Sequence, residues 1–235
     1  MTIETRTEFR QTLKLATPII ISNIGVNGMG LMDTMMVGQV STEELAGVAA
    51  GNGAFWMLAV TGMGTLTAMD TLVSQAHGAG NTEGKLRALV QGLWLALFMT
   101  LILSPLLLIV SAQFHWLGST PDILATTRPY LETVAWSIGP VLGYLVLARF
   151  WQAQEIVLPA TLLTILANGI NFLGNAAFVW GWWGFPEWGS KGVAIASLFS
   201  RSFLLICMVI YTAYSLRGVQ LNWRLDRAVF RKLLH

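Results

Sequence analysis

One acid and three amides, all placed inside long apolar segments, are the residues of this sequence best able to do chemistry. Asp33 lies in the first such segment, and Asn168, Asn171 and Asn175 follow one another at intervals of three and four residues in a later one. That spacing puts the three amides on one stripe of a helix. Carboxylate and amide oxygens are ligands for a hard cation, and a carboxylate also takes up a proton. The pattern predicts a site for Na⁺ or H⁺ formed by Asp33, Asn171 and Asn175, with Asn168 in support.

Other polar residues of the apolar segments are candidates for supporting roles. Arg201 lies in the last apolar segment, near the depth of Asp33, and would either pair permanently with that acid or tune the charge of the site. Asp70 and Gln75 lie near the end of the second segment, where Asp70 could equally be a simple interfacial acid. The asparagines alone could instead be hydrogen-bonding contacts between packed helices.

Composition decides the class of protein. Of the 235 residues, 54% are hydrophobic and 11% are charged, against about a quarter charged in soluble domains. The net charge of +2 is too small to give the positive electrostatic potential that a nucleic-acid-binding protein needs. Cys207 is the single cysteine, which excludes an internal disulfide and a thiolate zinc site. No phosphate-binding loop or nucleophile elbow is present, so we expect neither an enzyme nor a cofactor.

Charge-poor segments long enough to cross a bilayer recur along the chain, each close to the about 20 residues that a spanning helix needs. Six are found, at about residues 15–40, 45–75, 88–110, 130–151, 158–180 and 193–216. We therefore expect an all-α integral membrane protein in which residues 1–216 form one six-helix lobe. Residues 217–235 are basic, with apolar residues on one helical face, which predicts an amphipathic connector on the membrane surface.

The distribution of lysine and arginine predicts the orientation in the membrane. With the N-terminus in the cytoplasm, only Arg128 and Lys191 of the 14 basic residues fall outside, Arg201 lies within the last segment, and the rest fall inside. Since cytoplasmic loops carry the excess of basic residues, we expect both termini to be cytoplasmic. The acid and the two amides then lie at matching depth, roughly 8–14 Å from the outer ends of their segments at 1.5 Å per residue.

Five short motifs occur in order along the chain. They are Leu15-Ala-Thr-Pro18, Met29-Gly-Leu-Met-Asp-Thr-Met-Met-Val-Gly38, Asp70-Thr-Leu-Val-Ser-Gln-Ala-His-Gly-Ala-Gly80, Gln91-Gly-Leu-Trp94 and Gly184-Phe-Pro-Glu-Trp-Gly-Ser-Lys-Gly192. Together they resemble the multidrug and toxin extrusion (MATE) family, in particular its NorM-like bacterial branch. The resemblance spans essentially the whole chain.

This resemblance implies a secondary antiporter of the bacterial inner membrane, in which cationic drugs and toxins leave the cell while Na⁺ or H⁺ enters. Family members have twelve helices in two six-helix lobes that rock around a central cavity. In NorM-like members an aspartate of the first helix and asparagines of the fifth hold the cation, and these match Asp33, Asn171 and Asn175. The implied partners are membrane lipid, small cationic amphiphilic substrates and a second lobe.

The length of the chain corresponds to one such lobe. We expect an N-terminal half whose second lobe is missing, as a piece of a longer protein or the product of a truncated gene; alternatively, it is a half-transporter that pairs with a second copy. Two further functions stay open. A lipid or oligosaccharide-lipid flippase of the same superfamily would line its cavity with several cationic residues, of which Arg201 is the only deep one here. A transport-inactive membrane scaffold is the other.

Overall fold

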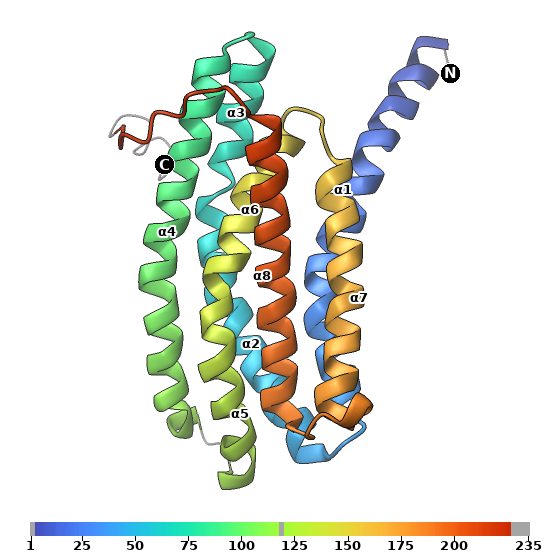
Figure 1. Ribbon diagram of the computed structural model, residues 1–235, viewed down its shortest axis with the longest axis vertical. Coiled ribbons are helices and arrows are strands. Elements are labelled where there is room, and N and C mark those ends of the chain that lie inside the picture. Colours follow the sequence, from blue (N-terminus) through green and yellow to red (C-terminus); the bar gives the residue numbers. More distant parts are fainter. Residues whose placement is uncertain (1–2, 118–119, 227–235) are drawn as a thin grey trace.

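Residues 3–117 and 120–226 are described by the structure, a computed structural model, and all the regular elements in these ranges are helical. Eight α-helices run roughly alongside one another (Figure 1). They are α1 (Ile3–Val37), α2 (Thr42–Thr65), α3 (Ala68–Gly78), α4 (Thr82–Ala112), α5 (Pro121–Val134), α6 (Ile138–Gln152), α7 (Leu158–Trp180) and α8 (Gly189–Ser215). Three short 3-10 turns join them, η1 (Phe114–Leu117), η2 (Ala135–Ser137) and η3 (Trp182–Gly184).

Two pairs of these helices each form one long, broken segment. α2 continues into α3 after two residues, and α5 continues through η2 into α6. Five helical segments of the described chain are therefore long and apolar enough to cross a membrane: Thr42–Gly78, Thr82–Ala112, Pro121–Gln152, Leu158–Trp180 and Gly189–Ser215. The segment expected at 130–151 begins earlier, because Pro121 starts a helix whose polar side chains bond within it, as Thr127 does to the Ile123 carbonyl.

The sixth expected segment, residues 15–40, falls mostly in α1, and it begins among residues whose side chains the structure does not describe. The first turns of α1 are charged, and its apolar part is diluted by glycines, asparagines and Asp33. It nevertheless packs against α7, α2 and α8 as part of the bundle. Among its polar residues, Ser22 and Asp33 are buried against the other helices, whereas Asn23 and Asn27 are exposed.

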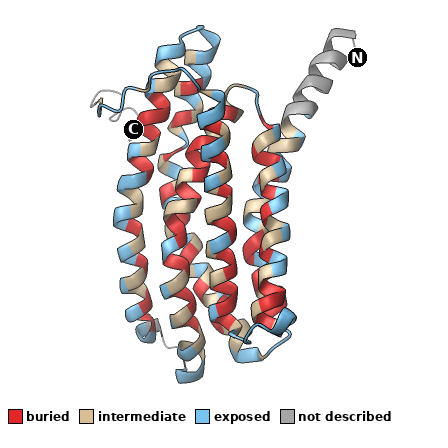
Figure 2. Cartoon of the chain, viewed as in Figure 1, coloured by how far each residue is buried: buried red, intermediate tan, exposed pale blue. Residues whose placement is uncertain are grey.

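The bundle has two ends that differ in their connections. One, here the α3–α4 end, carries the α3–α4 turn, the α6–α7 loop and the segment after α8; the other, the α7–α8 end, carries the α1–α2, α4–α5 and α7–α8 loops (Figure 1). Buried residues line the inner faces of the helices and exposed ones the outer faces (Figure 2). Many of the exposed residues are large and apolar, such as Leu101, Leu162 and Phe199. An apolar exterior around a packed interior is typical of a protein surrounded by lipid.

Glycines let particular helices approach closely. A Cβ at Gly25 of α1 would lie 2.4 Å from the Thr164 side chain of α7, and one at Gly51 of α2 would lie 2.6 Å from the Tyr130 ring of α5. Since atoms do not approach that closely, both contacts require a residue without a side chain. At Gly25 the backbone of α1 therefore lies directly against the side chains of α7.

Residues 217–226 differ from the predicted amphipathic helix. They form a turn and then an extended segment that crosses the α3–α4 end and lies along α4 (Figure 1). Backbone groups of this segment bond to side chains of α4 instead of to one another. Residues 227–235, the rest of the predicted connector, lie outside the described residues.

Candidate cation-binding site

A polar stripe runs along the face of α7 that packs on α1. It contains, at alternating intervals of three and four residues, Thr161, Thr164, Asn168, Asn171 and Asn175. Such spacing keeps side chains on one side of a helix. Thr161 and Asn168 donate hydrogen bonds to the backbone carbonyls of Pro18 and Gly25, both at 2.9 Å. The stripe therefore holds α1 in register against α7.

Asp33 lies at one end of this stripe, toward the α7–α8 end of the bundle, and is fully buried. The Nδ2 atoms of Asn171 and Asn175 both donate to its Oδ1, at 3.1 and 2.7 Å. The hydroxyl of Ser197, on α8, donates to its Oδ2. The structure thus brings together the three residues singled out from the sequence, from α1 and α7, and adds a fourth from α8.

The oxygen atoms of the same two amides lack partners. The Oδ1 atoms of Asn171 and Asn175 are buried, and no hydrogen-bond donor meets either of them among the described residues. Leaving a buried acceptor unsatisfied costs about 1–3 kcal/mol. The two amides present their N–H groups to Asp33; turned over, their oxygens would join the Asp33 carboxylate and the Ser197 hydroxyl in an all-oxygen donor set of the kind that hard cations take. The residues present therefore fit a small monovalent cation.

Arg201 lies one helical turn beyond Ser197 and is buried as well. Its Nη1 donates to the Ser137 hydroxyl at 2.7 Å, and the guanidinium lies 4.3 Å from the centre of the Phe55 ring. The ion pairs found in the described part of the chain do not include Arg201 with Asp33. The permanent pair that the sequence left open is therefore not formed in this structure, and the Nη2 of Arg201 has no partner there.

Sequence reasoning missed several members of this cluster. Ser197, Ser137 and Tyr130 are fully buried around the acid and the arginine, and the Tyr130 hydroxyl lacks a partner among the described residues. One signal was available for Ser197, because it precedes Arg201 by four residues and so shares its helical face. Small hydroxyl residues are common in membrane helices, which hides the others.

The predicted supporting residues do not all lie at the site. Asn168 is half-buried on the stripe, bonded to the backbone of α1. Asp70 is half-exposed at the α3–α4 end, where it forms an ion pair with Arg149 of α6 beside a pocket of about 410 Å³. Gln75 is exposed on α3. Asp70 and Gln75 therefore belong to another part of the lobe from Asp33.

Comparison with known proteins places the chain in a family. The MatE family model matches residues 18–177. A probable multidrug resistance protein NorM from Synechococcus is 32% identical over 216 residues, which are 89% of this chain and 45% of that protein. The multidrug resistance protein NorM of Aliivibrio fischeri is 29% identical over 220 residues, 92% of this chain and 48% of its own length.

Solved structures agree on the fold. The eukaryotic MATE transporter AtDTX14 superposes with a TM-score of 0.83 at 20% identity, over 97% of this chain and 50% of its own. The Vibrio cholerae MATE transporter VcmN, in its bent form, superposes with a TM-score of 0.79 at 18% identity, over 99% of this chain and 52% of its own. This chain spans about half the length of the relatives it matches. It is an integral membrane protein and belongs to the MatE family.

Proposed function

We propose that this chain is the N-terminal six-helix lobe of an antiporter that exports small cationic amphiphilic compounds in exchange for Na⁺ or H⁺. The relatives named as multidrug resistance proteins support the export of drugs. The observation that carries the coupling is the fully buried Asp33 beside two amide oxygens that have no donor. Such an arrangement is costly in an empty site and becomes favourable when a cation is bound.

The proposed site works by neutralising a buried carboxylate. Na⁺ would be held by Asp33, by the Oδ1 atoms of Asn171 and Asn175 and by the Ser197 hydroxyl, whereas a proton would bind to the carboxylate itself. Either cation changes which hydrogen bonds the carboxylate can accept. Because those bonds join α1 to α7 and α8, occupancy would bias the position of α1, and a ligand shifts a conformational equilibrium by its differential affinity for the two states.

A second six-helix lobe completes the proposed transporter. The chain spans about half of its relatives, so substrate would be bound between this lobe and another. Both termini would face the cytoplasm, with the basic α3–α4 end inside and Asp33 in the outer half. This orientation rests on the excess of Lys and Arg at that end.

Transport in liposomes tests the proposal. The protein, as its gene encodes it, is reconstituted with an imposed Na⁺ or pH gradient, and transport of the fluorescent cation ethidium is followed. We expect one of the two gradients to drive transport and Asp33→Asn to abolish it. Asp122→Asn, which removes an exposed acid of α5, is the matched control and should transport normally. Native-like transport by the Asp33→Asn protein would refute the assignment of the site.

A further inference from the structure

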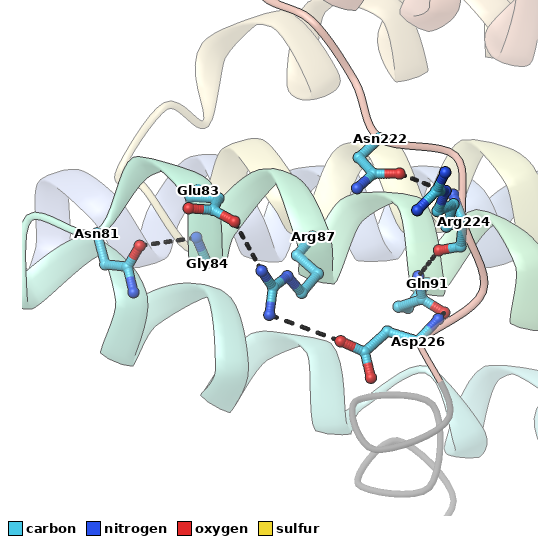
Figure 3. Close-up of polar contacts among 8 residues, drawn as sticks. All are labelled: Asn81, Glu83, Gly84, Arg87, Gln91, Asn222, Arg224 and Asp226. Atoms are coloured by element: carbon cyan, nitrogen blue, oxygen red, sulfur yellow. Dashed lines mark hydrogen bonds and ion pairs between the residues drawn. The ribbon is translucent and has the colours of Figure 1, made fainter.

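Gln91 of α4 binds the backbone of the segment that follows α8. Its side chain is fully buried at the α3–α4 end. The Nε2 donates to the carbonyl of Arg224 at 2.9 Å, and the Oε1 accepts from the backbone N–H of Asp226 at 3.1 Å (Figure 3). One amide side chain thus bonds to a carbonyl and an N–H two residues apart, as a neighbouring β-strand would.

Trp94 binds the backbone of the residue that precedes Arg224 in the segment. It lies three positions after Gln91, on the same side of α4, and its indole Nε1 donates to the carbonyl of Trp223 at 3.1 Å. The three bonds from Gln91 and Trp94 all go to main-chain atoms, so they select an extended conformation of the segment rather than particular side chains.

The glycine between these residues has a packing role. A Cβ at Gly92 would lie 2.2 Å from the Sδ of Met69, so its absence lets α4 pack against α3 at this level. The motif Gln91-Gly-Leu-Trp94 therefore combines a close helix contact on one side with two hydrogen-bonding side chains on another. Nothing in the proposed cation site uses this motif.

Charged groups surround the contact but contribute little to it. Arg87 bridges Glu83 at 2.6 Å and Asp226 at 3.6 Å (Figure 3). Both pairs are substantially exposed to solvent, and exposed ion pairs are weak. The buried amide of Gln91 is thus the contact most shielded from solvent.

We propose that Gln91 and Trp94 form a backbone clamp that fixes the path by which the chain leaves the six-helix lobe, and that transport requires this clamp. The clamp holds the segment after α8 against α4, on the other side of the α3–α4 end of the bundle from α8 (Figure 1). The position of residue 226, from which the chain continues, is therefore fixed relative to the bundle. Only the second part, the role in transport, rests on the proposed function.

Limited trypsin digestion tests the clamp. Arg224, whose carbonyl is held by Gln91, and Arg217, which precedes the clamped residues, are both exposed trypsin sites of the same segment. The ratio of cleavage after Arg224 to cleavage after Arg217 is measured by mass spectrometry on the purified protein in lipid nanodiscs. We expect Gln91→Leu to raise this ratio about tenfold, since two hydrogen bonds are lost, and Trp94→Phe to raise it less.

Gln75→Leu is the matched control for these variants, because it removes an exposed glutamine of the neighbouring helix α3, and it should leave the ratio unchanged. Trp94→Phe keeps an aromatic side chain and removes the indole donor, so it decides the question even where Gln91→Leu fails to fold. An unchanged ratio in the folded variants would overturn the clamp.

Ethidium transport by the same variants tests the second part. We expect Gln91→Leu to reduce the rate to about a third or less, without changing the cation concentration that gives half-maximal transport, because Asp33 is untouched. A released segment with native transport would show that transport does not need the clamp. Absence of cation-driven transport in the native protein would instead refute the proposed function, and the digestion result would still decide the clamp.

Discussion

Arg201 donates a hydrogen bond to the hydroxyl of Ser137 and is held there, above the ring of Phe55, rather than paired with Asp33. A buried cation and a buried anion thus share one cluster without direct contact. Bringing a second cation to the carboxylate places two like charges in a region of reduced dielectric, where their repulsion is stronger than in water. Arg201 would therefore weaken the binding of the coupling cation and favour its release.

Removing that charge should tighten cation binding. For Arg201→Met we expect the cation concentration that gives half-maximal ethidium transport to fall by about tenfold, since the lost repulsion is of the order of 1–2 kcal/mol at intermediate dielectric. Arg201→Lys keeps the charge and should remain close to native. A higher half-maximal concentration in the Arg201→Met protein would indicate that the arginine holds the site together instead.

Loss of an amide ligand should have the opposite effect. Asn175→Ala removes both a donor to Asp33 and one of the unpartnered oxygens, so we expect the half-maximal cation concentration to rise by at least about tenfold, the effect of losing about 1.4 kcal/mol of binding. Asn168→Ala, on the same stripe but bonded to the backbone of α1, serves as control. Equal responses of the two variants would mean that the asparagines act only as contacts between helices.

The Ser197 hydroxyl should stabilise the folded lobe through Asp33. Ser197→Ala leaves Oδ2 of a buried carboxylate without its donor, so the free energy of unfolding should fall by about 1–3 kcal/mol. Ser200 is equally buried on α8, but its hydroxyl bonds to the Ala196 carbonyl of its own helix. Ser200→Ala should therefore change stability much less, and thermal unfolding followed by circular dichroism in detergent compares the two.

The meeting of Asp33 with Asn171 and Asn175 could be predicted from the sequence because helical spacing and membrane depth are both local quantities. The amides share a stripe, and residues at one depth in neighbouring helices can meet. Ser197 and Ser137 could not be predicted in this way, since their place beside the acid and the arginine depends on how α8 and η2 are rotated within the bundle.

The segment after α8 shows a different limit of sequence reasoning. Its apolar spacing favours a surface helix, yet residues 223–226 are extended because Gln91 and Trp94, more than 125 positions earlier, bond to their backbone. A pattern within the segment carries no information about such distant partners.

Close packing of α1 on α7 at Gly25 should be required for a stable lobe. A Cβ there would lie 2.4 Å from Thr164, whereas one at Gly28, on the same helix, would lie 3.8 Å from its nearest neighbour, Asn168. Gly25→Ala must therefore force the two helices apart, at a cost of about 1–3 kcal/mol. Gly28→Ala meets only an ordinary contact and gains helix propensity, so it should be neutral or stabilising by up to about 1 kcal/mol. Thermal unfolding of both variants measures the difference, and equal stabilities would show that α1 can move away from α7 without cost.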